Sequence, residues 1–114
     1  MDRRIAAIAL LLAGCQSSRG LYIWGDYQNS VWQVTSTDGQ PDLGALVEDA
    51  KLTIQRSADR DIRVPPGLHA HLGMLLASQG QLDGAAAAFL TEKEVYPEST
   101  VLIDGILSRM GVTP

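Results

Sequence analysis

Two histidines, His69 and His71, have the clearest capacity in this chain to bind a metal or transfer a proton. They are two residues apart in a segment whose apolar spacing predicts a helix, so their side chains point to different faces of that helix. One metal ion therefore cannot take both as ligands, and no third ligand stands at a recognisable spacing from either. We expect neither a metal site nor a bound cofactor.

A second group with chemical potential is formed by Glu92, Glu94 and Glu98, because a pair of carboxylates can hydrolyse a glycosidic bond. The helical pattern favours a simpler interpretation, in which Glu92 and its neighbours lie on the solvated or partner-facing side of a helix. Ser17 and Ser18 lack the G-x-S-x-G setting of a nucleophilic serine, and the chain has no glycine-rich phosphate loop. The sequence thus predicts a non-catalytic protein. A peptidoglycan-binding or peptidoglycan-acting protein is the alternative.

Cys15 is the only cysteine, and it ends a segment with the three parts of an export signal. Arg3 and Arg4 give a positive start, residues 5–12 are apolar, and small residues precede Cys15. The apolar part is much shorter than the roughly 20 residues that span a bilayer, so residues 1–14 are predicted to be a signal peptide that is removed. A plain secretory signal with an incidental cysteine is the other interpretation.

The residues around Cys15 favour a lipid anchor, because LAGC at positions 12–15 resembles the bacterial lipobox. This resemblance implies that the Cys15 thiol carries diacylglycerol and that the new amino terminus carries a further acyl chain such as palmitate. Two or more acyl chains give stable membrane attachment. Gln16, in place of Asp, is similar to the sorting signal of Gram-negative lipoproteins sent to the outer membrane. The resemblance implies anchoring in the outer membrane. We favour the periplasmic side, and the cell surface is the alternative.

Length and charge limit what the mature protein can be. Removal of residues 1–14 from the 114-residue chain leaves 100 residues, the size of one small domain. The mature chain has a formal charge near −5, which does not favour a nucleic-acid partner. Residues 15–20 are interpreted as the lipidated cysteine and a polar tether, and residues 21–114 as a single folded domain.

Aromatic side chains gather just after the tether: Tyr22, Trp24, Tyr27 and Trp32. These rings either cover the apolar face of the domain or lie at the lipid interface, where Trp and Tyr are enriched. We favour core packing, since a small domain without disulfides needs its large side chains. The surface that remains for a partner is expected to include Tyr22, Trp24 and Trp32. These lie beside an exposed edge of the helix at residues 68–79, around His69 and His71.

Apolar periodicity and chain breakers predict a series of helices. Asp26 is expected to cap a helix of about two turns. Asp42 opens a longer helix whose stripe is Leu43, Leu46, Val47, Ala50, Ile54 and Ala58. Pro66 is expected in the first turn of the next helix. The longer helices are predicted at residues 42–59, 68–79, 83–96 and 101–110.

Residues 66–99 resemble one tetratricopeptide repeat, which is a helix-turn-helix unit. Small Gly73 and Ala85 are expected to face each other where the two helices cross. The pattern is matched without insertion by His69, Leu72, Gly73, Leu76, Ala85, Phe89 and Pro97. The predicted fold is therefore all-α, a single tetratricopeptide-like helical hairpin with flanking helices.

Three motifs in order, YIWGDY, VPPGLHAHLG and EKEVYPES, resemble a family of small uncharacterised Gram-negative outer-membrane lipoproteins. Genes of that family commonly lie beside those for lipoproteins similar to the curli-secretion channel. The resemblance implies a lipid-anchored adaptor, an accessory subunit of a cell-envelope protein assembly. Its implied partners are other envelope lipoproteins, including a curli-secretion-channel-like subunit.

Replacement of Cys15 tests the anchor directly. Cys15→Ser removes the thiol that the lipobox interpretation requires, so the precursor should stay unprocessed and should incorporate no fatty acid. Metabolic labelling with a radioactive fatty acid, followed by electrophoresis, measures both effects. Label in the variant equal to that in the wild type would show that Cys15 is not the site of acylation.

Overall fold

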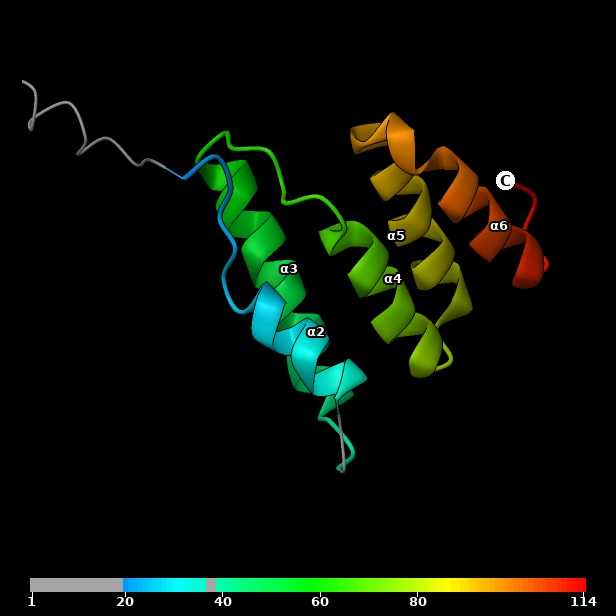
Figure 1. The fold of residues 1–114 in the computed structure, drawn as a ribbon, viewed down its shortest axis with the longest axis horizontal. Helices are drawn as coiled ribbons and strands as arrows, with labels where there is room; N and C mark the ends of the chain where they lie inside the picture. The colour runs from blue at the N-terminus through cyan, green and yellow to red at the C-terminus, as the bar shows by residue number, and fades with distance from the viewer. Residues whose placement is uncertain (1–19, 37–38) are drawn as a thin grey trace, which may run out of the picture.

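The computed structural model describes residues 20–36 and 39–114, and within these ranges all of its regular structure is helical (Figure 1). The all-α architecture predicted from the sequence, a helical hairpin with flanking helices, is confirmed. The predicted signal peptide and Cys15 lie outside the described residues. The elements are α2 (Tyr27–Thr35), α3 (Leu43–Asp59), α4 (Leu68–Ser78), α5 (Leu82–Val95), the 3-10 helix η1 (Pro97–Ser99) and α6 (Thr100–Arg109).

Local signals set most helix ends. Asp42 caps α3, because its Oδ1 accepts a hydrogen bond of 3.1 Å from the Ala45 amide. The predicted side-chain cap at Asp26 is wrong, since the Asp26 side chain makes no capping hydrogen bond to α2. Gly80, with a φ of 78°, turns the chain out of α4. The prediction for Pro66 is wrong: Gly67 is the N-cap of α4, with a φ of 88°, so Pro66 lies before the first turn. The left-handed conformation at Gly67 suits a residue without Cβ.

Helices α4 and α5 form the central hairpin and supply most of the core. Gly73 lies close to the Phe89 ring, since a Cβ added to Gly73 would lie 2.9 Å from that ring. The sequence pattern predicted that Gly73 faces Ala85 where the helices cross. Ala85 is fully buried, but the side-chain atoms nearest to Gly73 belong to Phe89. The buried apolar side chains of the hairpin are Leu68, Leu72, Leu75, Leu76, Ala85, Ala88 and Phe89.

The flanking helices cover the hairpin from two sides. From α3, the predicted stripe buries Leu46, Val47 and Ala50. The stripe ends early, since Ala58 is exposed. On the other side, α6 packs against α5 and buries Ile103 and Leu107.

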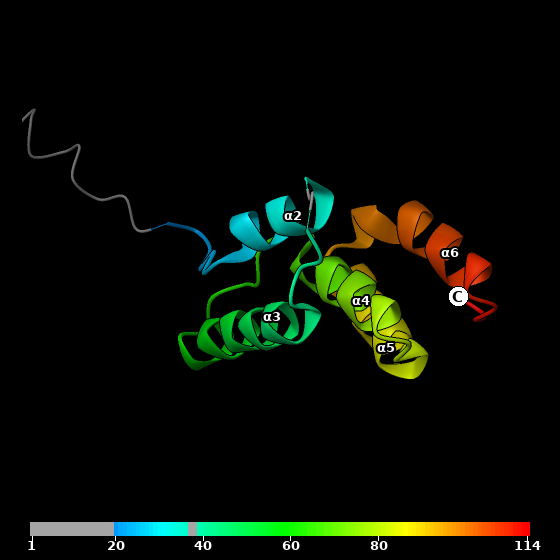
Figure 2. The same ribbon diagram turned by 90° about the horizontal axis from the view of Figure 1, so that it is seen from below.

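Helices α2 and α6 lie on the same side of the molecule, with α4 between them (Figure 2). Residues of α2, α4 and α6 together line an open cavity. None of the described helices is long and apolar enough to cross a membrane.

Enlarging Ala85 should destabilise the hairpin, because this side chain is completely buried. Overpacking a filled core costs typically about 1 to 3 kcal/mol, so we expect Ala85→Leu to lower the free energy of unfolding by about that amount. Ala87→Leu is the matched control, since Ala87 lies on the exposed side of α5, and exposed substitutions change stability by less than about 0.5 kcal/mol. Urea unfolding of the full chain measures both. Equal stability of the two variants would contradict the packing described.

Candidate partner-binding site

Glu92 of α5 is buried, with only 3% of its surface exposed, and its carboxylate binds the start of α4. Oε1 accepts a hydrogen bond of 2.7 Å from the Gly67 amide, and Oε2 accepts one of 3.3 Å from the Ala70 amide. The first amides of any helix lack partners within the helix, and the helix dipole favours a negative charge there. The prediction that Glu92 lies on the solvated side is wrong, because α5 places it at the amino end of α4. Glu94 and Glu98 are exposed, as predicted.

Burial and the charge of Glu92 set the protonation of the neighbouring groups. Burial lowers the pKa of His69, and the negative charge of Glu92 partly opposes this shift. Burial raises the pKa of Tyr27, and the charge of Glu92 adds to that rise. Burial is also the main cause that raises the pKa of Tyr96 to about 12, and the Tyr96 hydroxyl donates a 2.6 Å hydrogen bond to the Val64 carbonyl.

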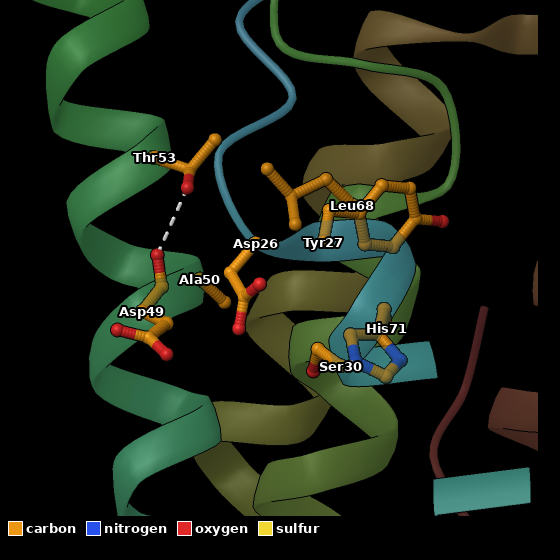
Figure 3. A pocket seen from close by; sticks show the side chains of 8 residues that line it. All are labelled: Asp26, Tyr27, Ser30, Asp49, Ala50, Thr53, Leu68 and His71. Atoms are coloured by element: carbon orange, nitrogen blue, oxygen red, sulfur yellow. Dashed lines mark hydrogen bonds between the residues drawn. The ribbon is translucent and has the colours of Figure 1, made fainter. Parts of the chain in front are cut away.

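His71 joins α4 to α2. Its Nε2 shares a 2.7 Å hydrogen bond with Oγ of buried Ser30, and its ring lies 5.5 Å from the Tyr27 ring. Figure 3 shows the three side chains together in the contact region between α2, α3 and α4, which we call the seam. The seam itself has no space for a water molecule. Because Ser30 is almost inaccessible, this serine and histidine tie two helices together and do not form a reactive pair.

The two histidines are not where the sequence placed them. The expectation that His69 and His71 lie at an exposed edge of α4 is wrong, since their exposed fractions are 9% and 8%. As expected, they have different surroundings: Glu92 acts on His69, whereas Ser30 binds His71. Among residues 20–36 and 39–114, no three His, Cys, Asp or Glu side chains are grouped as metal ligands would be.

An open apolar groove lies along α4, with α2 on one side and α6 on the other. It consists of two adjoining open cavities of about 280 and about 240 Å³, which share Val34, His71 and Met74. The larger cavity lies between α4 and α6, with Phe89 of α5 among its lining residues, and the smaller lies along α2 and α4. The lining residues of both cavities are Tyr27, Val31, Val34, Thr35, Gly67, Ala70, His71, Met74, Leu75, Ala77, Ser78, Phe89, Ile106 and Met110.

The chemistry of the groove suits an apolar, uncharged group. No Asp, Glu, Lys or Arg lines either cavity, and the hydrogen-bonding side chains are limited to His71 and a few hydroxyl groups. A charge inserted there would lose its hydration without gaining a partner. The only methionines after Met1, Met74 and Met110, both line the groove. Methionine adapts its shape to a ligand and is common at adaptable binding surfaces.

The predicted aromatic surface separates into two parts. Trp24 stacks on Tyr27 with 6.0 Å between ring centroids, and Tyr22 meets Trp24 edge-on at 5.9 Å. These three rings lie before and at the start of α2. Trp32 stands apart on the same helix and is 68% exposed. Tyr22 is half-buried, whereas Trp24 is 41% exposed. The expectation of core packing is therefore wrong for Trp24 and Trp32.

Sequence reasoning missed the groove because its lining comes from four helices. Met74 and Met110 were the available clue, since both lie in apolar stretches of the sequence. Neither side chain takes part in an evident motif.

These features define a small all-α protein with a central helical hairpin and an apolar groove. Residues 21–106 match the family described as a domain of unknown function, DUF4810. The match spans most of the chain, which therefore belongs to the DUF4810 family. No curated protein and no solved structure matches the chain.

Removing the Glu92 charge should destabilise the whole domain. In Glu92→Gln an amide replaces one of two accepting oxygens, so either the Gly67 or the Ala70 amide loses its acceptor. A hydrogen bond to a charged group contributes about 1.5 to 3 kcal/mol, and we expect a loss of that size in urea unfolding. Glu94→Gln, two residues away on the exposed side, is the matched control. A loss no larger than that of Glu94→Gln would refute the capping role.

Proposed function

We propose that this protein is a non-catalytic adaptor that binds an apolar segment of a partner protein in the groove between α2, α4 and α6. The groove is the observation that carries this proposal. Its volume accommodates apolar side chains and its lining is free of charge. Of the two wall helices, α6 packs on α5 and α2 is bonded to α4 through Ser30 and His71. Apolar surfaces left open on a small domain commonly mark interaction sites.

The lipid anchor and the cellular setting complete the proposal. The lipobox-like sequence at Cys15 supports attachment to the outer membrane through diacylglycerol and an N-acyl chain. Resemblance of the hairpin sequence to a tetratricopeptide repeat supports a scaffold role, because such repeats bind proteins. The resemblance to outer-membrane lipoproteins supports partners among envelope lipoproteins, including a curli-secretion-channel-like subunit. The protein would then act as an accessory subunit of an envelope assembly.

The alternative of a peptidoglycan-acting protein has less support. It assigned a functional role to Glu92 and the histidines, whereas these side chains are buried and have structural hydrogen bonds or charge contacts. A carboxylate that caps a helix does not reach a glycan strand. Glu94 and Glu98 remain exposed, but neither lines the groove or the seam at His71.

A charge placed in the groove should abolish partner binding without unfolding the protein. Met74 is suited to this test because it lines both cavities and is 54% exposed, so Met74→Glu can keep its carboxylate hydrated in the free protein. Burying that carboxylate against an apolar partner is costly, and we expect at least a tenfold loss of co-purified partner from detergent-solubilised membranes.

Leu52→Glu is the matched control, because Leu52 has a similar exposure of 47% and lies on α3, outside the groove. Circular dichroism checks that both variants keep their helical content. If Leu52→Glu loses partner as strongly as Met74→Glu, the groove is not the binding site. Release of muropeptides by the wild-type protein would favour the alternative function.

A further inference from the structure

Helix α2 forms one wall of the groove, yet few contacts hold it. It has nine residues and no side-chain hydrogen bond at its N-cap, and isolated helices of this length are marginal in water. Its side-chain hydrogen bond to α4 joins Ser30 to His71, and Tyr27 packs against the His71 ring. The Tyr27 hydroxyl also occupies the space that a Cβ at Gly67 would fill. Helix α2 also packs on α3, so it is the docking of α2 on α4 that depends on the contacts at His71.

His71 occupies the junction of all these contacts. It hydrogen-bonds Ser30, touches Tyr27 and lines both cavities of the groove. A change in its charge therefore acts on the α2 seam and on the groove at once.

The charged and titratable groups around His71 give its protonated form little support. Asp26 and Tyr27 come from α2, and Asp49 comes from α3; all three line the closed seam with His71. The carboxylates of Asp26 and Asp49 belong to exposed residues, where water screens their charges. From α5, Glu92 acts on His69 and Tyr27, and its oxygens are engaged by backbone amides. Ile106 of α6 and Met110, which directly follows α6, are the apolar residues that this end of the chain adds to the groove.

We propose that protonation of His71 releases α2 from α4, so that α2 is a pH-sensitive wall of the groove. Neutral His71 holds the helix and keeps the groove formed. The cation cannot stay in the seam, because it would be buried without a charged partner. The link to partner affinity rests on the proposed function of the groove, whereas the release of α2 does not.

The direction of the pH dependence follows from burial. Burial lowers the pKa of His71 below its ordinary value of 6.5. When α2 is released, the exposed imidazole regains a pKa near 6.5, so the released state binds more protons in the interval between the two values. Docking is therefore strongest above pH 6.5 and weakens as pH falls through that interval. With one proton involved, the opening equilibrium changes by at most about tenfold per pH unit.

Hydrogen exchange read by mass spectrometry tests the release in the full chain purified in detergent. Protection factors, corrected for the chemical exchange rate, are compared between about pH 7.5 and about pH 5. We expect the amides of α2 to lose protection by up to about tenfold per pH unit, while those of α5 keep theirs. His71→Gln, which can still bond Ser30 but does not titrate, should abolish the pH dependence. His69→Gln, at the other buried histidine, should retain it.

Ser30→Ala is a second control, because weaker docking of α2 in His71→Gln would by itself remove the pH dependence of protection. It removes the same hydrogen bond but leaves the imidazole, so α2 should be less protected at neutral pH and should still respond to acid. Unchanged α2 protection in wild type across this range would overturn the proposal. A pH response that persists in His71→Gln, or that includes α5 equally, would also overturn it.

A neutral apolar dye, N-phenylnaphthylamine, connects the release to the groove. Its fluorescence on binding should fall with pH in the wild type and stay constant in His71→Gln. If Met74→Glu binds the dye as well as the wild type at neutral pH, the groove is not the apolar site. That result would not contradict the release of α2. Dye binding that depends on Met74 but not on pH would overturn the coupling alone.

Discussion

The contact between the Glu92 carboxylate and the first amides of α4 is the interaction on which the rest of the structure depends. It joins two helices through atoms 25 residues apart in the chain and satisfies amides that α4 cannot satisfy itself. A buried carboxylate is tolerated only where its oxygens are hydrogen-bonded. This requirement fixes the height and orientation of α4 on α5. Tyr96, bonded to Val64, holds the chain segment that enters α4 from the same side.

Once α4 is fixed, its two sides have different roles. One side packs against α5, with Gly73 allowing the Phe89 ring to approach the backbone. The other side presents His71 and Met74 to the gap between α2 and α6. The hairpin thus forms the floor of the groove. The two wall helices, α2 and α6, differ in how strongly they are attached to it. Packing of α6 through two fully buried side chains contrasts with α2, which depends on a polar bond to one imidazole.

This inequality gives the groove both a stable part and an adjustable part. Apolar surface on a rigid floor provides binding energy without the cost of ordering many side chains, and the flexible methionines accommodate differences in shape. A weakly held wall helix lets a small free-energy change alter the site, because the elements that move are those of low local stability. The groove lining is uncharged and largely apolar, which is the chemistry that the proposed binding of an apolar partner segment requires.

Much of the fold could be predicted from the sequence, because the signals that define each helix are local. Apolar spacing, the Asp42 cap and Gly80 placed α3 and the hairpin helices close to their observed bounds. The candidate site was less predictable. The rule that charged side chains face solvent failed at Glu92, and the polarity of His69 and His71 suggested exposure where the structure buries both.

The sequence by itself determined the helices, the hairpin and the absence of a recognisable catalytic motif, since each depends on residues within a few turns of one another. Only the tertiary structure decided which polar side chains are buried and where the open apolar surface lies. Glu92 meets Gly67 across 25 residues and His71 meets Ser30 across 41. The groove likewise exists only because α2 and α6, from opposite ends of the described chain, stand on either side of α4 (Figure 2). Such pairings depend on how helices cross, and no local pattern encodes the partner of a buried charge.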